Sequence, residues 1–120
     1  MEFETVKADS SREWNFTDPI KLIWTDPPYG TGKVMEQRGN KFKDLSPTGA
    51  ITLTLNALDL AANYLTNDGV VCICADYRII HHLIVELDWL NFQGEIIWTF
   101  GLGRPRENWW PVRHNNSHLY

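Results

Sequence analysis

The spacing of apolar residues changes several times along the chain, and each change predicts a new element of secondary structure. Residues 21–25 have the composition of a short β-strand. Apolar residues then recur at helical spacing over 51–65 and again over 80–90. A continuous apolar run of strand length fills 70–75, and residues 95–100 are strand-like. Strands that alternate with helices predict an α/β fold, with a mostly parallel sheet, flanking helices and right-handed crossovers.

Prolines and glycines divide this pattern. Pro27 and Pro28 end the first strand, because proline lacks the N–H that a sheet ladder uses. The triplet 67–69 (Asn-Asp-Gly) is a turn signal that should end the first helix before the strand at 70–75 begins. The segment 30–49 carries several glycines and a proline, and we expect it to be a mobile loop.

The composition limits the class of protein. With 120 residues, 43% hydrophobic and 22% charged, the chain matches a single globular domain. No apolar run reaches the length of a bilayer and the first residues do not form a signal peptide, so no membrane partner is expected. Cys72 and Cys74 lie inside an apolar run, where cysteine acts as a small hydrophobe. We therefore expect no disulfide and no zinc site, and a reducing, cytoplasmic setting.

Charge is unevenly distributed. The net charge of -4 argues against binding of nucleic acid over the whole surface. Two segments are nevertheless basic: residues 33–43 have four cations against Glu36, and residues 104–114 have three against Glu107. Each segment is either a solvated loop or a phosphate-binding surface. The candidate DNA-binding residues in them are Lys33, Arg38, Lys41, Lys43, Arg104, Arg106, Arg113 and His114.

The residues with the clearest chemistry are Asp26, Pro27, Pro28 and Tyr29, at the end of the first strand. Ligands of open α/β sheets bind beyond the carboxyl ends of strands. A carboxylate and a proline-fixed carbonyl offer two rigid acceptors for the N–H groups of an exocyclic amine, and a tyrosine offers a face on which a flipped base can stack. The structural alternative is a Pro-Pro turn capped by an aspartate.

Residues 23–32, which contain this tetrapeptide, resemble the catalytic motif of amino-group DNA methyltransferases. These enzymes transfer a methyl group from S-adenosylmethionine to adenine N6 or cytosine N4, and aspartate at the first motif position is usual in the adenine enzymes. Residues 94–103 and 113–120 resemble later segments of the same family. The resemblance implies a partial Rossmann-like methyltransferase fold and a place in restriction-modification. The four strands would begin at Lys21, Val70, Glu95 and Ser117.

The order of motifs implies that residues 1–120 form the catalytic half, with the cofactor-binding half absent. Residues 99–103 approach the family's glycine-rich cofactor turn, but a threonine stands in the aromatic position and Arg104-Pro105 follows, so we reject them and leave the cofactor-binding residues unassigned. The implied partners are double-stranded DNA and either a complementary cofactor-binding subunit or a second copy. Association is expected because Leu22–Trp24 would lie on an unpaired strand edge.

Several alternatives remain beside the enzyme. The chain could be a truncated or remnant methyltransferase that binds DNA or a partner without catalysis, or it could methylate RNA or a protein amine. Residues 30–33 fail as a phosphate-binding loop, because Pro27 and Val34 occupy positions that need glycine and a hydroxyl. His81-His82 point apart on a helix, so no metal site is expected there. Trp109-Trp110 either stack on bases or pack a loop.

We expect the purified chain to bind S-adenosylmethionine weakly or not at all, because the turn and the acidic residue that hold the methionine and ribose parts are missing. Isothermal titration calorimetry measures this directly. A dissociation constant in the low-micromolar range would contradict the prediction and would restore residues 101–103 as a cofactor turn.

Overall fold

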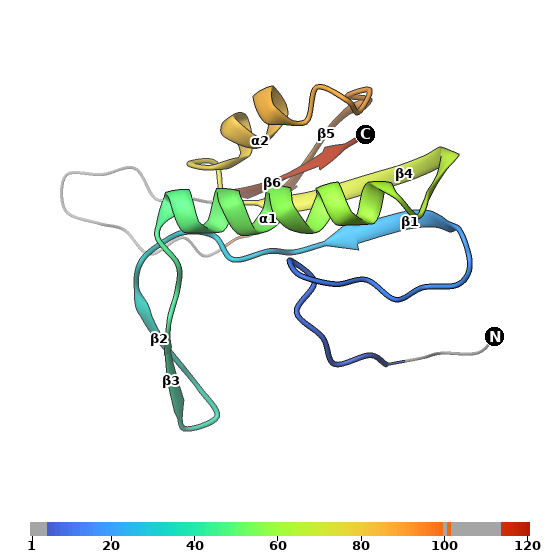
Figure 1. The fold of residues 1–120 in the computed structure, drawn as a ribbon. Helices are drawn as coiled ribbons and strands as arrows, with labels where there is room; N and C mark the ends of the chain where they lie inside the picture. The colour runs from blue at the N-terminus through green and yellow to red at the C-terminus, as the bar shows by residue number, and fades with distance from the viewer. Residues whose placement is uncertain (1–4, 100, 102–113) are drawn as a thin grey trace.

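The computed structural model describes residues 5–99, 101 and 114–120, and these form a mixed α/β structure with a projecting hairpin (Figure 1). In chain order the elements are β1 (Ile20–Thr25), β2 (Val34–Gln37), β3 (Asn40–Lys43), α1 (Pro47–Ala62), β4 (Leu65–Ala75), α2 (Ile80–Glu86), β5 (Gly94–Thr99) and β6 (His114–Leu119). The α/β class predicted from the apolar spacing is confirmed.

The four strands of the main sheet lie in the order β1-β4-β6-β5. β1 pairs with β4 in parallel, whereas β6 runs antiparallel to both of its neighbours, so β1, β4 and β5 all point the same way. The prediction of a mostly parallel sheet is therefore wrong in the pairing. The physical reason is that Thr99, the last residue of β5, lies opposite His114, the first residue of β6, so β6 starts at the end of the sheet where β5 stops and runs antiparallel to it.

Several boundaries differ from the prediction, and β6 begins at His114 rather than at Ser117. The residues 67–69, predicted as a turn, lie within β4. The pairing with β1 is irregular there, since Ile20 lies opposite Leu65 but Leu22 lies opposite Val70. The segment 30–49, predicted as a loop, contains the antiparallel hairpin of β2 and β3 and the start of α1. The hairpin turn is made by Arg38 and Gly39, both with positive φ, which suits the twist of a two-residue connection.

α1 begins where the sequence supplies a cap. The Ser46 side chain accepts a hydrogen bond from the Gly49 N–H at 3.1 Å, and Pro47 follows at the first turn, where its missing N–H costs nothing. α2 is shorter and ends at Glu86. Among the described residues, no helix is both long and apolar enough to cross a membrane.

Both helices pack on one face of the sheet. Val71, Ile73 and Ala75 alternate along β4 and are fully buried in one cluster that also holds residues of the two helices. α1 contributes Ala50, Leu58 and Ala61, and α2 contributes Ile80 and Leu83. Because side chains alternate across a strand, this single cluster fixes which face of β4 is the core.

The opposite face of the sheet carries exposed apolar side chains at its two outer strands. Leu22 and Trp24 of β1 flank the buried Ile23, and they are 58% and 66% exposed. Ile96 and Trp98 of β5 are 50% and 67% exposed. In the described residues β1 has a strand neighbour on one side only, so it is an edge strand with apolar side chains beside the open edge.

Candidate functional site

The tetrapeptide Asp26–Tyr29 leaves the carboxyl end of β1, beside the carboxyl end of β4. The parallel register sets Thr25 opposite Ile73, so the two strands end close together. Pro27 is buried, Pro28 and Tyr29 are half-buried, and Asp26 is exposed. The two prolines stop the ladder and fix the backbone, so the carboxylate is held at a rigid strand end. The structure thus places these four consecutive residues at the carboxyl end of a parallel strand pair.

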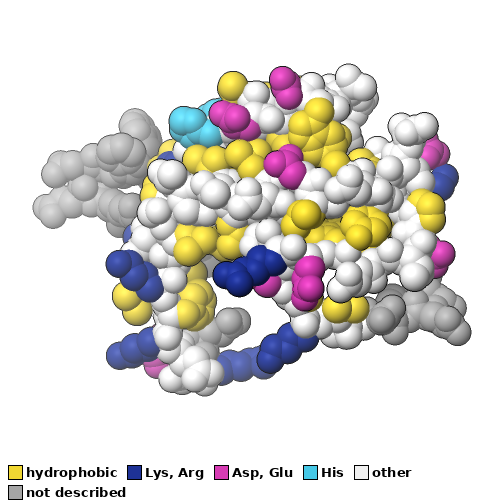
Figure 2. Space-filling model, viewed as in Figure 1, with side chains coloured by type: hydrophobic (Ala, Val, Ile, Leu, Met, Phe, Trp, Pro, Cys, Tyr) yellow, Lys and Arg dark blue, Asp and Glu magenta, His cyan; other side chains and the backbone are white. Residues whose placement is uncertain are grey.

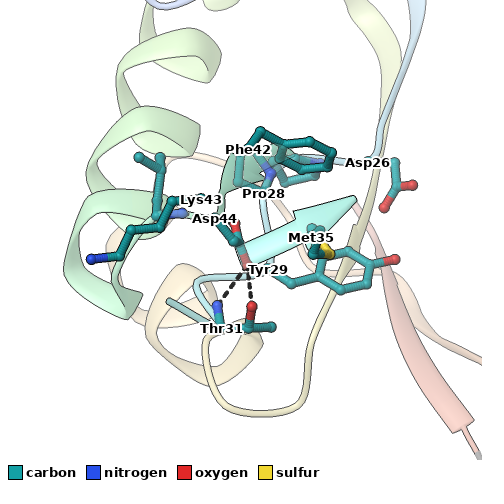
Figure 3. A pocket seen from close by; sticks show the side chains of 10 residues that line it. Asp26, Pro28, Tyr29, Thr31, Met35, Phe42, Lys43 and Asp44 are labelled. Carbon is teal, nitrogen blue, oxygen red and sulfur yellow. Dashed lines mark hydrogen bonds between the residues drawn. The ribbon is translucent and has the colours of Figure 1, made fainter. Parts of the chain in front are cut away.

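A pocket of about 400 Å³ opens at this strand end, within the size range of ligand sites (Figure 3). The tetrapeptide forms one part of its wall, and the hairpin with the segment that follows it forms the other. The lining residues are Asp26, Pro27, Pro28, Tyr29, Thr31, Met35, Phe42, Lys43, Asp44 and Leu45. Of the hairpin residues in this lining, Lys43 was predicted as a DNA-binding residue, whereas Met35 and Phe42 were not predicted as part of the site.

Tyr29 lies in an environment that keeps its hydroxyl protonated. Burial raises the pKa of Tyr29 to about 12, and hydrogen bonding with the Asp26 carboxylate adds to the shift. The negative charges of Asp26 and Asp76 act in the same direction. The phenol is therefore neutral at all ordinary pH values.

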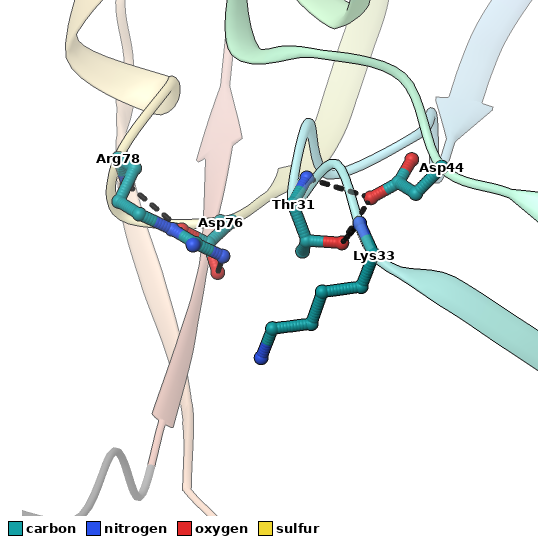
Figure 4. Close-up of polar contacts among 5 residues, drawn as sticks. All are labelled: Thr31, Lys33, Asp44, Asp76 and Arg78. Atoms are coloured by element: carbon teal, nitrogen blue, oxygen red, sulfur yellow. Dashed lines mark hydrogen bonds and ion pairs between the residues drawn. The ribbon is translucent and has the colours of Figure 1, made fainter.

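Asp44 ties the hairpin to the turn that follows the tetrapeptide. Its carboxylate accepts hydrogen bonds from the Thr31 N–H at 2.7 Å, from the Thr31 hydroxyl at 2.6 Å and from the Leu45 N–H at 2.8 Å (Figures 3 and 4). The Gly32 N–H donates to the Leu45 carbonyl at 2.9 Å. Hydrogen bonds from Thr31 hold the pKa of Asp44 below its ordinary value, although burial opposes the shift.

Gly30 makes the closest backbone approach in the site. Its φ is +66°, and a Cβ at this position would lie 2.7 Å from the Cα of Pro47 and 3.2 Å from the Cβ of Ala50. Only glycine meets both conditions, since other residues rarely adopt this conformation and no room exists for a side chain. The turn after Tyr29 therefore packs directly against the start of α1.

Asp76 is a buried carboxylate that the sequence reading missed. It follows β4 directly and forms a bidentate ion pair with Arg78 (Figure 4). The Arg78 Nε donates to Oδ1 of Asp76 at 2.6 Å, and Nη2 donates to Oδ2 at 2.9 Å. Burial raises the pKa of Asp76, but hydrogen bonds and charge from Arg78 outweigh that effect and keep the pKa below its ordinary value. A polar residue immediately after the apolar run 70–75 was the available signal.

Four of the candidate DNA-binding residues lie on or beside the hairpin. Lys33 precedes β2, Arg38 forms the turn, and Lys41 and Lys43 lie on β3; all four are exposed. Figure 2 shows dark-blue side chains along this projecting part of the molecule. None of the four has an ion pair with another described residue within 4.0 Å, so their charge is available to a ligand.

Other candidates are only partly described. Arg104, Arg106 and Arg113 lie outside the described residues, as do Trp109 and Trp110. His114 is the first residue of β6, and the structure describes its backbone but not its side chain. His81 and His82 are exposed on α2, and no group of three metal-ligating side chains occurs in the part of the chain that the structure describes. Cys72 and Cys74 are free and buried.

Comparison with known proteins adds no assignment. No family model matches the chain. No curated protein matches it either. The function must therefore be argued from the site.

Replacing Gly30 with alanine should destabilise the protein more than the same change at Gly32. Both glycines have positive φ, at +66° and +64°, so both variants carry the backbone cost of about 1–2 kcal/mol. A Cβ at Gly32 meets nothing within 4 Å, whereas one at Gly30 meets Pro47. We expect Gly30→Ala to lower the free energy of unfolding, measured by urea denaturation, by about 1–3 kcal/mol more than Gly32→Ala does. Equal losses would mean that the turn and α1 are not packed together.

Proposed function

We propose that this chain is the catalytic half of an amino-directed DNA methyltransferase, adenine-N6 specific, with a partial Rossmann-like fold. One observation carries the proposal: Asp26, Pro27, Pro28 and Tyr29 line a pocket at the carboxyl end of a parallel strand pair. Ligands of α/β sheets bind at this place. The resemblance of residues 23–32 to the family's catalytic motif gives the pocket its chemistry.

The tetrapeptide would hold the target amine by two acceptors. The Asp26 carboxylate can accept from Tyr29 and still accept from an amine N–H, because it has about four lone-pair sites. Within the described residues the Pro27 carbonyl oxygen has no hydrogen-bond donor, so it supplies the second acceptor. Holding both N–H groups directs the nitrogen lone pair outward, and this interaction strengthens as the nitrogen becomes positively charged in the transition state.

The proposed cofactor is S-adenosylmethionine, which supplies an electrophilic methyl group when bound. A second pocket, of about 360 Å³, adjoins Asp26–Pro28 on the side of α1 and is lined largely by apolar and aromatic side chains such as Trp14, Trp24 and Leu53. Asp26 is its only acidic residue, and the Thr54 hydroxyl already donates to Ala50. These residues do not make a ribose site, so we propose that another subunit completes the cofactor site.

The hairpin would contact double-stranded DNA. Lys43 lines the pocket, and Lys33, Arg38 and Lys41 are exposed on or beside the same hairpin. These cations would neutralise phosphates. Such contacts position the duplex without reading its sequence. The net charge of -4 argues against DNA binding over the whole surface and favours basic segments such as the hairpin.

A second candidate function is a non-catalytic binding module, and the edge strand β1 favours it. Leu22 and Trp24 expose most of their surface beside an open strand edge, an arrangement that soluble proteins usually cover. The same edge would serve a complementary cofactor-binding subunit or a second copy in the catalytic reading. Both functions therefore use the open edge of β1 as a contact surface, and only the first includes methyl transfer.

Asp26→Ala should abolish methyl transfer while leaving DNA affinity nearly unchanged, because it removes a transition-state acceptor and no phosphate contact. We expect a loss of at least about a thousandfold in turnover. The measurement is transfer of labelled methyl groups to DNA, with the full chain and any subunit that co-purifies with it.

Lys41→Ala is the reciprocal control for this experiment. It should weaken binding to all DNA sequences and reduce the salt slope by about one, without a specific loss in turnover of bound DNA. Turnover at the wild-type rate in Asp26→Ala would refute the assignment of the centre.

The chain should associate through β1 in solution. We expect the mass from light scattering to rise with concentration, or a partner to remain bound through purification. Trp24→Lys should reduce either association, because it places a charge on an exposed apolar position without touching the core. A wild-type chain that stays monomeric at high concentration, with the amides of Leu22–Trp24 protected from exchange, would contradict the prediction.

A further inference from the structure

The second pocket lies along the open edge of β1. It has a volume of about 360 Å³, and Ile23, Trp24 and Thr25 all line it. Consecutive side chains of a strand point to opposite faces of the sheet, so a cavity that touches all three lies at the edge of the strand. Ser10 and Trp14, which belong to no strand, line the same cavity. Figure 1 shows their segment, in blue, on the side of β1 that faces away from β4.

Residues 9–14 form a compact turn that is held by its own hydrogen bonds. The Asp9 carboxylate accepts from the Ser11 N–H at 3.1 Å and from the Ser11 hydroxyl at 2.6 Å. The Arg12 N–H donates to the Asp9 carbonyl at 3.0 Å. The indole N–H of Trp14 donates to the Ser10 carbonyl at 2.6 Å. Because these contacts lie within the turn, it keeps its shape when it moves.

One aromatic cluster attaches this N-terminal turn to the body of the protein. Trp14 packs against the hydrophobic core, and its ring stacks on the ring of Tyr64 with 6.5 Å between centroids. The Tyr64 hydroxyl donates to the Trp14 carbonyl, and Phe16 makes edge contacts with both rings. Within residues 5–19, all side chains except those of Ser11 and Trp14 are exposed. Trp14 is therefore the main anchor of the turn.

The N-terminal turn lies beside β1 without pairing with it. In the part of the chain that the structure describes, no hydrogen bond joins residues 5–19 to residues 21–25. The turn therefore covers the open edge but leaves its N–H and C=O groups without a strand partner. An added strand would supply the main-chain hydrogen bonds that the turn does not.

A second copy of β1 fits this edge. In an antiparallel pair centred on Ile23, the two copies of Ile23 lie opposite each other, and Leu22 lies opposite Trp24. Leu22 and Trp24 are 58% and 66% exposed, so their pairing would remove apolar surface from water. Lys21 lies opposite Thr25, so no like charges meet. The edge is thus self-complementary, as a two-fold dimer requires.

We propose that the N-terminal turn is a displaceable cover of the β1 edge, which gives way to β1 of a second copy of this chain. The inference rests on the association through β1 proposed above, adds the element that regulates it, and does not depend on methyl transfer. Only molecules in which the turn has moved away can pair. The turn therefore weakens the apparent affinity of dimerisation by the fraction of molecules that are open.

Trp14→Ala should lower the concentration of half-maximal dimerisation, measured by light scattering, by about tenfold, since one aromatic contact accounts for about that factor. Trp14→Phe should stay close to wild type, because a ring still packs against Tyr64. Trp89→Ala is the matched control. Trp89 is also partly exposed, at 43%, and lines a pocket that contains no residue of β1, so its loss should leave dimerisation unchanged.

The double variant Trp14→Ala/Trp24→Lys separates an uncovered edge from general unfolding. A charge at position 24 should cancel the gain in dimerisation, because it opposes the pairing of β1, whereas aggregation of a destabilised chain would persist. Hydrogen exchange gives a second readout. Among the amides of Leu22–Trp24, those that point away from β4 should exchange in dilute wild-type chain and become protected in the Trp14→Ala dimer.

The outcomes separate this inference from the proposed function. If Trp14→Ala dimerises no more tightly than wild type, the turn does not cover the edge, although a wild-type dimer that Trp24→Lys disrupts would still support association through β1. If the double variant associates as strongly as Trp14→Ala, the contact lies elsewhere and the inference fails. Retention of a different subunit without self-association would overturn the second copy as the occupant. The methyl-transfer assay of Asp26→Ala is independent of all three results.

Discussion

The parallel pairing of β1 with β4 is the constraint on which the site depends. It brings the carboxyl ends of two strands to the same edge of the sheet, with Thr25 opposite Ile73. Asp26 and Asp76 then follow these ends, and each begins a segment that cannot continue the ladder. The buried alternate residues of β4 lock this register from the core side, because a slip by one residue would expose Val71 and Ile73.

Polar contacts at the base of the hairpin also hold the site in place. Asp44 satisfies donors from the turn after Tyr29, and Gly30 allows that turn to approach α1. A buried carboxylate with several donors is stable only in this geometry, since an unmet charge in that place would be costly. The catalytic candidates are therefore held by elements on both sides: the sheet through β1, and the hairpin and α1 through Asp44 and Gly30.

Local patterns predicted most elements but not their pairing. Helical spacing located both helices, and apolar or strand-like runs located β1, β4 and β5, because burial leaves a periodic trace. The strands β2 and β3 lie in a segment that was predicted as a loop. The position of Asp26–Tyr29 at a strand end followed from the two prolines. The antiparallel place of β6 and the contact of Gly30 with Pro47 join residues that local spacing does not relate. The turn signal at 67–69 wrongly predicted a break before the strand, because these residues lie within β4 at an irregularity in its pairing with β1.

The sheet order also sets a sequence of events for folding. β1, α1 and β4 form a unit of contacts within residues 20–75, so this unit can assemble early. β5 pairs in the described structure only with β6, and β6 separates it from β4. Until residues 114–119 have been synthesised, β4 keeps an open edge along Cys72–Ala75 and β5 has no place in the sheet. The nascent chain therefore passes through a stage with an aggregation-prone edge on β4, which ends only when β6 has been made and pairs there.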